Sequence, residues 1–263
     1  MSKSQQEAAL TYQQKLEQEN ADLKTALAML RQDQQAGYHV QQSLLPANPT
    51  FLDGYRLDYW LQPSLYLSGD FVDCWPISDH QLLFYLADVS GHGASSAFVT
   101  ILIKYLLGKY SEEEGFSPAS LCARVNEELV TGELDKHLTL VLGCLDTRKQ
   151  VLTYALGAHL PAPLLVDQQG QVQELSGSGM PIGLFPGAQY QDYTCSFPDR
   201  GRLCVASDGI LELMPGQGLE ERQQQWQKSV AETRGDIQGL LQSLSVEQGD
   251  WPDDITLMTL TGC

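Results

Sequence analysis

The chain has 263 residues, 43% of them hydrophobic, which is enough for one large domain or two small ones around a real core. Its 33 acidic and 16 basic residues give a formal charge of −17, which argues against binding to nucleic acid or an anionic membrane surface, because both need clustered Lys and Arg. None of the six cysteines forms a CxxC pair, and no apolar run approaches the roughly 20 residues of a membrane span. These features predict a cytoplasmic protein in a reducing compartment.

The first predicted element is a long helix within residues 1–45. Leucines of one seam recur every seven residues, at Leu16, Leu23 and Leu30. The second seam is mixed and holds Asn20, Leu27 and Gln34. The pattern fits a single amphipathic helix lying on its own domain, but its length favours a two-stranded parallel coiled coil and a homodimer, with Asn20 fixing the register. Gly37 predicts a bend or a flexible joint.

From residue 46 onward the pattern is that of a globular domain, residues 46–263. Apolar runs predict strands at Arg56–Leu61, Leu82–Val89, Thr139–Leu145, Val151–Leu156, Pro163–Val166, Val172–Leu175, Tyr190–Phe197, Leu203–Ser207 and Ile255–Leu260. Helices are predicted at Ala94–Tyr110, Pro118–Val130, Glu220–Thr233 and Asp236–Leu244. Short turns at residues 146–150 and 168–170 predict hairpins of antiparallel strands. Because strands and helices are grouped rather than strictly alternating, the fold class is predicted to be α+β.

Four aspartates stand beside apolar segments, where an unpaired carboxylate is costly. They occur in Ser68-Gly69-Asp70, Ala87-Asp88-Val89-Ser90-Gly91-His92-Gly93, Ser207-Asp208-Gly209 and Asp253-Asp254-Ile255-Thr256. Brought together, they would repel one another, and a pair of divalent cations would remove that cost. Oxygen ligands select Mg²⁺ or Mn²⁺ over Zn²⁺, and two such ions can activate a water and clamp a phosphate ester. The four aspartates therefore predict a metal-dependent hydrolase.

Each motif alone also has a simpler explanation. Asp208-Gly209 can be an ordinary turn, Asp253-Asp254 an acidic loop, and residues 90–93 a tight turn before a helix. The prediction therefore depends on the combination and the order of the motifs. Rival chemistries lack their signatures, since the sequence has no P-loop, no dinucleotide fingerprint, no GxSxG elbow and no zinc-type spacing of His and Cys.

In this order the motifs resemble those of the PPM (protein phosphatase 2C) superfamily, and more narrowly the SpoIIE/RsbU branch of bacterial serine/threonine phosphatases. The resemblance covers about residues 36–260. Further matching segments are Val40-Gln41-Gln42-Ser43-Leu44-Leu45-Pro46 and Met180-Pro181-Ile182-Gly183-Leu184-Phe185-Pro186. Residues 85–99 are especially similar to the phosphatase domain of RssB/HsbR-type response regulators. We therefore expect the chain to be the output half of a two-component response regulator, with an upstream receiver domain.

The resemblance implies a four-layer αββα sandwich of two antiparallel sheets flanked by helices. It also implies a site for two Mn²⁺ or Mg²⁺ ions. Asp88 would bridge both ions, the backbone carbonyl of Val89 would bind one, Asp208 and Asp254 would hold the other, and Asp70 would complete the site. All four carboxylates would act in catalysis through metal-bound water.

Three departures from the family pattern affect individual residues. Ser68 stands where a glycine is common, which is a mild change. The family's Asn-Ala-Gly-His-Asn-Pro segment reads Leu-Gly-Ala-His-Leu-Pro at residues 156–161, so His159 is interpreted as structural. His92 is interpreted as a neighbour of the metal site rather than the acid for the leaving group. Asp73 and Asp253 are spare acids that would hold a further ion or tune the local field.

The function implied by the resemblance is that of a protein-serine/threonine phosphatase, a hydrolase acting on a phosphorylated anti-sigma-factor antagonist or a related regulatory protein. The alternative, from another class, is a non-catalytic adaptor that binds a sigma-factor regulatory protein. The complete set of carboxylates favours the enzyme, because an adaptor would carry them as an unexplained electrostatic cost.

Overall fold

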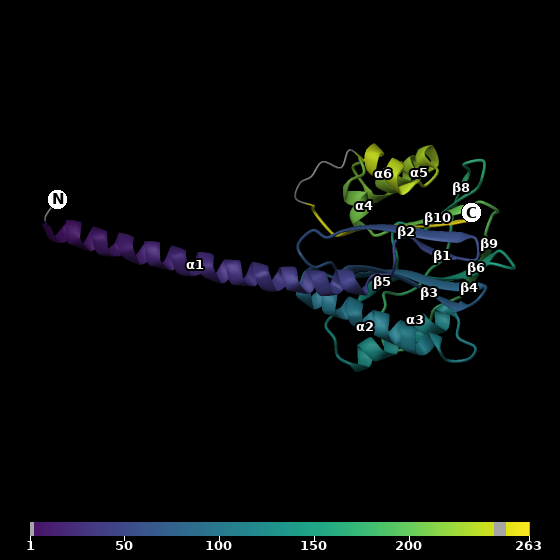
Figure 1. Cartoon of the computed structure of the whole chain (residues 1–263), viewed down its shortest axis with the longest axis horizontal. Coiled ribbons are helices and arrows are strands. Elements are labelled where there is room, and N and C mark those ends of the chain that lie inside the picture. Colours follow the sequence, from purple (N-terminus) through teal and green to yellow (C-terminus); the bar gives the residue numbers. More distant parts are fainter. Residues whose placement is uncertain (1–2, 245–250, 263) are drawn as a thin grey trace.

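The computed structural model describes residues 3–244 and 251–262. A long helix precedes a sandwich of two antiparallel sheets, and helices cover both outer faces (Figure 1). This arrangement confirms the predicted α+β class and the four-layer αββα architecture. Among the described residues, none of the helices combines the length and the apolarity that crossing a membrane would require.

One sheet contains six strands in the order β1-β2-β11-β10-β7-β8. Their bounds are β1 Thr50–Leu52, β2 Tyr55–Gln62, β7 Leu164–Val166, β8 Val172–Glu174, β10 Arg202–Ala206 and β11 Ile255–Gly262. Three helices cover its outer face: α4 Gly209–Glu212, α5 Leu219–Thr233 and α6 Ile237–Ser243. Trp226 and Val230 of α5 are buried against this face together with Leu257 of β11. We call this sheet, which carries the C-terminal strand, the six-stranded sheet.

The second sheet contains five strands in the order β3-β4-β5-β6-β9. Their bounds are β3 Asp70–Ser78, β4 Gln81–Val89, β5 Leu138–Asp146, β6 Val151–Gly157 and β9 Tyr193–Ser196. Helices α2 Ala94–Ser111 and α3 Pro118–Thr131 cover its outer face. Helix α3 begins at a capping box, in which the Ser117 side chain accepts from the Ser120 N–H and Ser120 accepts from the Ser117 N–H. The predicted hairpins β5–β6 and β7–β8 are both confirmed.

The main core lies between the two sheets. Alternate residues of β4, such as Phe84 and Leu86, face Val205 and Met258 of the six-stranded sheet. The intervening residues, such as Leu83, face α2 and α3. Both faces of β4 are therefore buried, which explains why its sequence is almost continuously apolar rather than alternating.

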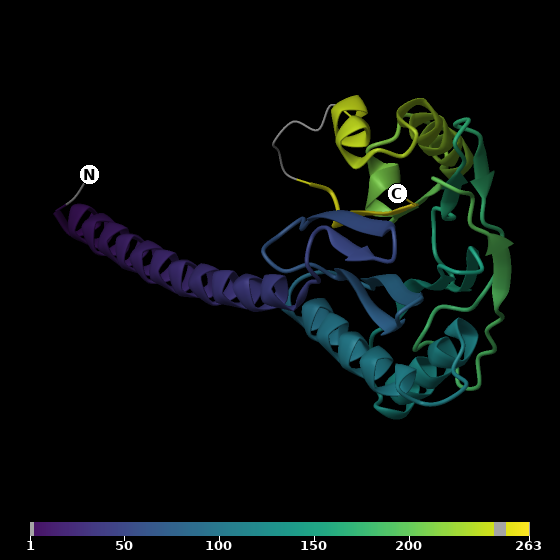
Figure 2. The same cartoon turned by 45° about the vertical axis from the view of Figure 1, so that its right-hand side comes forward.

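Helix α1 runs without interruption from Lys3 to Leu44 and projects away from the sandwich (Figures 1 and 2). The bend predicted at Gly37 was therefore wrong, because the helix continues through it. Gly37 has a different role: a Cβ at this position would lie 3.3 Å from the side chain of Leu67, so the glycine allows the helix to approach the domain closely. The predicted coiled coil stays a prediction.

Two strands and one helix were not predicted. Strand β3 contains Asp73 and Pro76, which interrupt its apolar pattern, and it lies at the edge of its sheet, where proline is tolerated. Strand β1 and helix α4 are only three and four residues long. Five cysteines are free thiols in the described part of the chain, in agreement with the absence of a predicted disulfide framework. Cys263 lies outside the described residues.

Candidate active site

The four predicted aspartates lie close enough to affect one another's titration, near the point where Gln41 at the end of α1 contacts Ser68. Asp70 is the first residue of β3 and is paired with Asp88, near the end of β4, in antiparallel register. Asp208 follows β10 and Asp254 precedes β11, and these two strands are also antiparallel neighbours. Antiparallel pairing thus brings two pairs of distant carboxylates to the same end of the molecule.

Hydrogen bonds join the two pairs across the space between the sheets. The Thr256 hydroxyl of β11 donates to Oδ2 of Asp70 at 2.7 Å. Asp254 accepts at Oδ2 from the Gly69 N–H at 2.6 Å, and at Oδ1 from the N–H and the hydroxyl of Ser64 at 2.7 and 2.8 Å. Asp254 therefore holds the segment of chain that leads into Asp70.

Two glycines in the motifs permit close approach of backbone segments. A Cβ on Gly69 would lie 2.8 Å from the carbonyl oxygen of Val89, the predicted backbone ligand. A Cβ on Gly209 would lie 2.1 Å from the carbonyl oxygen of Asp254. Both distances are shorter than a non-bonded carbon–oxygen contact, so only glycine fits at these two positions. The Gly-Asp and Asp-Gly motifs therefore reflect how tightly the ligand-bearing segments cross.

Burial and mutual proximity raise the pKa of three of the four carboxyl groups. Burial and the charge of Asp88 raise the pKa of Asp70 well above its usual range. Burial, with the charges of Asp208 and Asp253, raises the pKa of Asp88 to about 8. Partial burial and the charge of Asp253 raise the pKa of Asp208 as well.

A cavity of about 390 Å³ opens over this cluster. Its lining includes Asp88, Asp208 and Asp253 together with the imidazoles of His92 and His137. Behind the turn at residues 90–93, the Lys136 ammonium donates to the Ser90 carbonyl at 2.8 Å and to the Ser96 hydroxyl at 3.2 Å. Lys136 thus ties together the turn that follows Val89 and the first turn of α2.

The donor set fits a hard divalent cation. It consists only of carboxylate and carbonyl oxygens, which suit Mg²⁺ and Mn²⁺, and its excess negative charge is what such an ion would neutralise. Within residues 3–244 and 251–262, no three His, Cys, Asp or Glu side chains are already gathered tightly enough to hold a metal ion. The ligand roles of Asp70, Asp88, Val89, Asp208 and Asp254 stay predictions.

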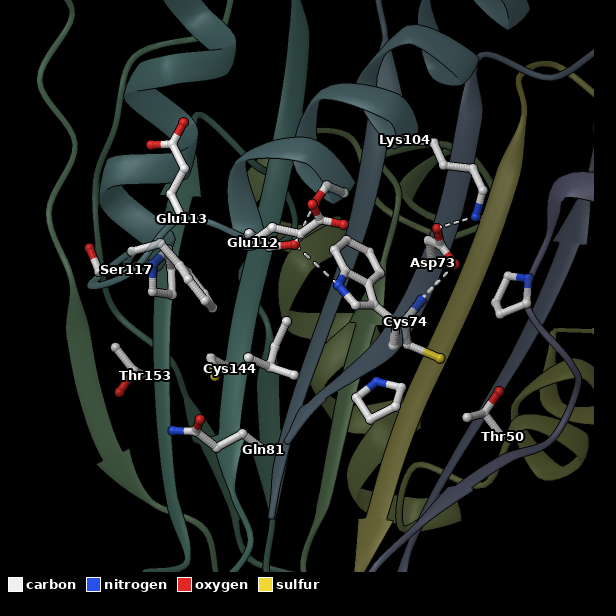
Figure 3. A pocket seen from close by; sticks show the side chains of 18 of the residues that line it. Thr50, Asp73, Cys74, Gln81, Lys104, Glu112, Glu113, Ser117, Cys144 and Thr153 are labelled. Atoms are coloured by element: carbon white, nitrogen blue, oxygen red, sulfur yellow. Dashed lines mark hydrogen bonds and ion pairs between the residues drawn. The ribbon is translucent and has the colours of Figure 1, made fainter. Parts of the chain in front are cut away.

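The two spare acids differ. Asp253 lines the cavity of the cluster. Asp73 instead forms an ion pair with Lys104 of α2, and its other oxygen accepts from the Cys74 N–H at 2.9 Å. Asp73 lies at the wall of a separate cavity of about 1190 Å³ between β3, α2 and the end of α1, as Figure 3 shows. It is therefore part of the junction between α1 and the domain, not of the acidic cluster.

His159 is buried, as expected for a structural residue. Its Nε2 lies 2.8 Å from the carbonyl oxygen of Ala206 and its Nδ1 lies 3.2 Å from the Thr139 hydroxyl, so it links the two sheets. Burial lowers the pKa of His159 to about 4. The imidazole is therefore neutral at pH 7 and serves as a crosslink beside the cluster.

Gln41 positions the chain near the cluster, and the sequence indicates it only as part of the matching segment at residues 40–46. Gln41, near the end of α1, is buried. Its amide nitrogen donates to the Ser68 carbonyl at 2.8 Å, and its amide oxygen accepts from the Ser68 N–H at 3.1 Å. The contact joins α1 to the residue that precedes Gly69 and Asp70. Nothing in the spacing of the sequence indicates a contact between residues 27 positions apart.

Comparisons with known proteins agree with this geometry. The chain is 28% identical over 169 residues to the phosphoserine phosphatase RsbP of Bacillus subtilis, covering 62% of this chain and 41% of RsbP. It spans less than half the length of the curated relatives it matches. Among solved structures, the SiaA-PP2C domain of Pseudomonas aeruginosa has a TM-score of 0.75 at 18% identity, covering 90% of this chain and 98% of that domain.

A crystal structure of RsbX in complex with magnesium has a TM-score of 0.62 at 14% identity, covering 81% of this chain and 98% of RsbX. At this identity the two structural likenesses establish the fold alone. The family follows from the sequence: residues 78–261 match the family model of Stage II sporulation protein E (SpoIIE). The chain therefore belongs to the SpoIIE family of PP2C-type serine/threonine phosphatases.

Proposed function

We propose that this chain is a metal-dependent protein-serine/threonine phosphatase that hydrolyses phosphoserine or phosphothreonine on a regulatory protein of the anti-sigma-factor-antagonist type. The observation that carries the proposal is the convergence of Asp70, Asp88, Asp208 and Asp254 from four separate segments. The raised pKa values of three of them indicate a site that is electrostatically incomplete without cations.

In this proposal Asp70, Asp88, Asp208, Asp254 and the carbonyl of Val89 hold two Mn²⁺ or Mg²⁺ ions. Such ions, when bound, supply Lewis acidity and lower the pKa of a water that attacks phosphorus. The chain's own residues set the geometry: Gly69 and Gly209 let the ligand segments cross, and Lys136 fixes the turn at residues 90–93. The imidazoles of His92 and His137 at the cavity can bind the phosphoryl oxygens or the leaving group.

We further propose that residues 1–45 dimerise this protein and connect it to a receiver domain, and that residues 46–263 form the catalytic domain. Leu16, Leu23 and Leu30 of the heptad seam are 44%, 70% and 56% exposed on the projecting helix, so the seam is left uncovered by the part of the chain that the structure describes. A second α1 would cover it as a parallel coiled coil. The contacts of Gly37 with Leu67 and of Gln41 with Ser68 give a path from helix packing to the acidic cluster.

The decisive variant is Asp88→Asn. It removes the proposed bridging ligand while keeping the shape of the side chain. Hydrolysis of p-nitrophenyl phosphate with Mn²⁺ should fall by more than about 100-fold, since loss of even the outer partners of metal ligands commonly gives 10–100-fold losses. The thermal stabilisation of the wild type by Mn²⁺, about 2.7 kcal/mol at 100 times the dissociation constant, should disappear as well.

Asp79→Asn is the matched control, because Asp79 is exposed in the turn between β3 and β4, away from the cluster. Equal rates for wild type and Asp88→Asn, or full activity with excess chelator, would contradict the enzyme proposal. If Mn²⁺ also leaves the thermal stability unchanged, the non-catalytic adaptor becomes the better explanation.

A further inference from the structure

A second cavity, of about 330 Å³, opens beside the acidic cluster. Asp208 and Asp253 line both this cavity and the one over the cluster, so the two are neighbours that share a wall. This cavity lies between residue 160, helix α4 and the start of α5. We call it the side pocket.

Three leucines from separate segments give the side pocket an apolar lining. They are Leu160 after β6, Leu211 in α4 and Leu219 at the start of α5. Leu211 is buried, but Leu160 and Leu219 are 42% and 52% exposed. Exposed apolar side chains that gather at a cavity next to a site mark a surface that a partner can cover.

Arg222 supplies an unused hydrogen-bond donor in the same pocket. One terminal nitrogen of its guanidinium donates to Oε1 of Glu212 at 3.0 Å. Its Nε is buried and has no hydrogen-bond partner anywhere in the described part of the chain. Because Nε has almost no accessible surface, the donors that an incoming carbonyl oxygen can meet are the terminal N–H groups of the guanidinium that are not bonded to Glu212.

The charges of the side pocket decide which kind of side chain would enter. Asp208, Glu212 and Asp253 line it and Arg222 is the sole base, already paired with Glu212. An acidic side chain would be repelled by the surplus of carboxylates. A neutral apolar side chain would gain contact with the three leucines, and the carbonyl of its backbone could accept a hydrogen bond from the Arg222 guanidinium.

We infer that the side pocket is a recognition subsite for a bulky apolar side chain close to the phosphorylated residue of the substrate. The inference rests on the proposed phosphatase function and deepens it. With the phosphoryl group at the acidic cluster, the neighbouring segment of the substrate lies across the wall formed by Asp208 and Asp253. Its apolar side chain then enters among the leucines, and its backbone carbonyl accepts from a terminal N–H of the Arg222 guanidinium.

The test uses phosphoserine heptapeptides that carry Leu or Ser at each of the three positions on either side of the phosphoserine. With Mn²⁺, the wild type should show a kcat/KM at least about tenfold higher for Leu than for Ser at one position or more, equivalent to about 1.4 kcal/mol. In Leu219→Ser, the ratio of kcat/KM for the Leu peptide to kcat/KM for the Ser peptide should fall to about 1. Leu184→Ser is the matched control, because Leu184 is 44% exposed but lines neither cavity, and it should keep the ratio.

Arg222→Lys separates the donor from the charge. Lysine keeps the positive charge opposite Glu212 but lacks the further guanidinium N–H donors, so kcat/KM should fall for every peptide relative to p-nitrophenyl phosphate, by about three- to tenfold. The Leu preference itself should remain. A loss that is equal for the peptides and for p-nitrophenyl phosphate would contradict the role given to the guanidinium.

The outcomes distinguish the subsite from the underlying function. A wild type that hydrolyses p-nitrophenyl phosphate with Mn²⁺ but shows no Leu preference, or a Leu219→Ser variant that keeps the preference, overturns the subsite alone. A wild type that hydrolyses neither the peptides nor p-nitrophenyl phosphate overturns the proposed function. In that case fluorescence anisotropy of the labelled Leu and Ser peptides decides the subsite, since equal affinities would refute it.

Discussion

The two halves of the acidic site are held in different ways. Asp70 and Asp88 lie within paired strands of the five-stranded sheet, so the backbone ladder itself sets their separation. Asp208 and Asp254 lie just outside β10 and β11, in segments that no ladder holds. Their positions depend on a glycine contact and on hydrogen bonds to residues 64–69.

The difference indicates which half of the site can move. Ladder hydrogen bonds in a buried sheet open only with large parts of the domain, whereas loop contacts open locally at lower cost. The strand half therefore acts as a fixed reference. We therefore expect the loop half, together with residues 64–69 that Asp254 contacts, to move more easily.

Adding a side chain where the loop half is most tightly packed should give the largest loss of stability. In Gly209→Ala the new Cβ would lie 2.1 Å from the Asp254 carbonyl oxygen, so one of the two backbone segments must shift. We expect a loss of about 3 kcal/mol in the free energy of unfolding, measured by urea denaturation. Because Asp208 and Asp254 then separate, the affinity for Mn²⁺ should fall as well.

Gly108→Ala is the matched control. Gly108 lies within α2, and a Cβ there would meet nothing within 4 Å. This change should stabilise the protein by up to about 1 kcal/mol, because alanine favours a helix. A Gly209→Ala protein as stable as the wild type would mean that the loop half tolerates displacement without cost.

His159, which links the two sheets, should make the stability of the protein depend on pH in the acid range. The folded state lowers the pKa of His159 from 6.5 to about 4, so it binds fewer protons there than the unfolded state. The contribution of neutral His159 to the free energy of unfolding is fully present above pH 6.5. It is lost as the pH falls toward 4, by up to about 3 kcal/mol. His159→Gln cannot be protonated and should remove this part of the pH dependence.

The measurement is the free energy of unfolding from pH 7 to pH 4 for both proteins with chelator present. The difference between the two curves isolates His159 from the aspartates, which titrate in the same range. His39→Gln, an exposed histidine of α1, serves as the control. Parallel curves for wild type and His159→Gln would show that the buried imidazole is protonated in the folded protein.

Much of the strand half could be predicted from the sequence because its signals are local. The apolar run before Asp88 and the glycines after it predicted a strand ending in a turn and a helix from Ala94, and the structure has both. The order of the four motifs predicted the fold. Strand β3 was missed because Asp73 interrupts its apolar pattern, and the partner that makes Asp73 acceptable, Lys104, is 31 residues away.

The loop half could not be predicted in the same way, because its contacts join distant residues. Ser64 and Asp254 are 190 positions apart, and neither carries a pattern that indicates the other. From the sequence, Gly209 could equally be an ordinary turn glycine. Its role depends on the carbonyl oxygen of Asp254, which lies too close to leave room for a Cβ. Motifs that present a side chain are visible in a sequence, but the contacts that position them become visible only in the fold.

The smallest expected effect concerns the contact between α1 and the segment that leads into Asp70. Gln41→Ala leaves the N–H and the carbonyl of Ser68 without their partners in a buried place, which should cost about 1–2 kcal/mol in the free energy of unfolding. Since Ser68 leads directly into Gly69 and Asp70, the affinity for Mn²⁺, measured by titration calorimetry, should fall severalfold. Gln35→Ala, at an exposed position of the same helix, should change neither quantity. A Gln41→Ala protein that loses stability but keeps its Mn²⁺ affinity would show that α1 supports the domain without reaching the acidic cluster.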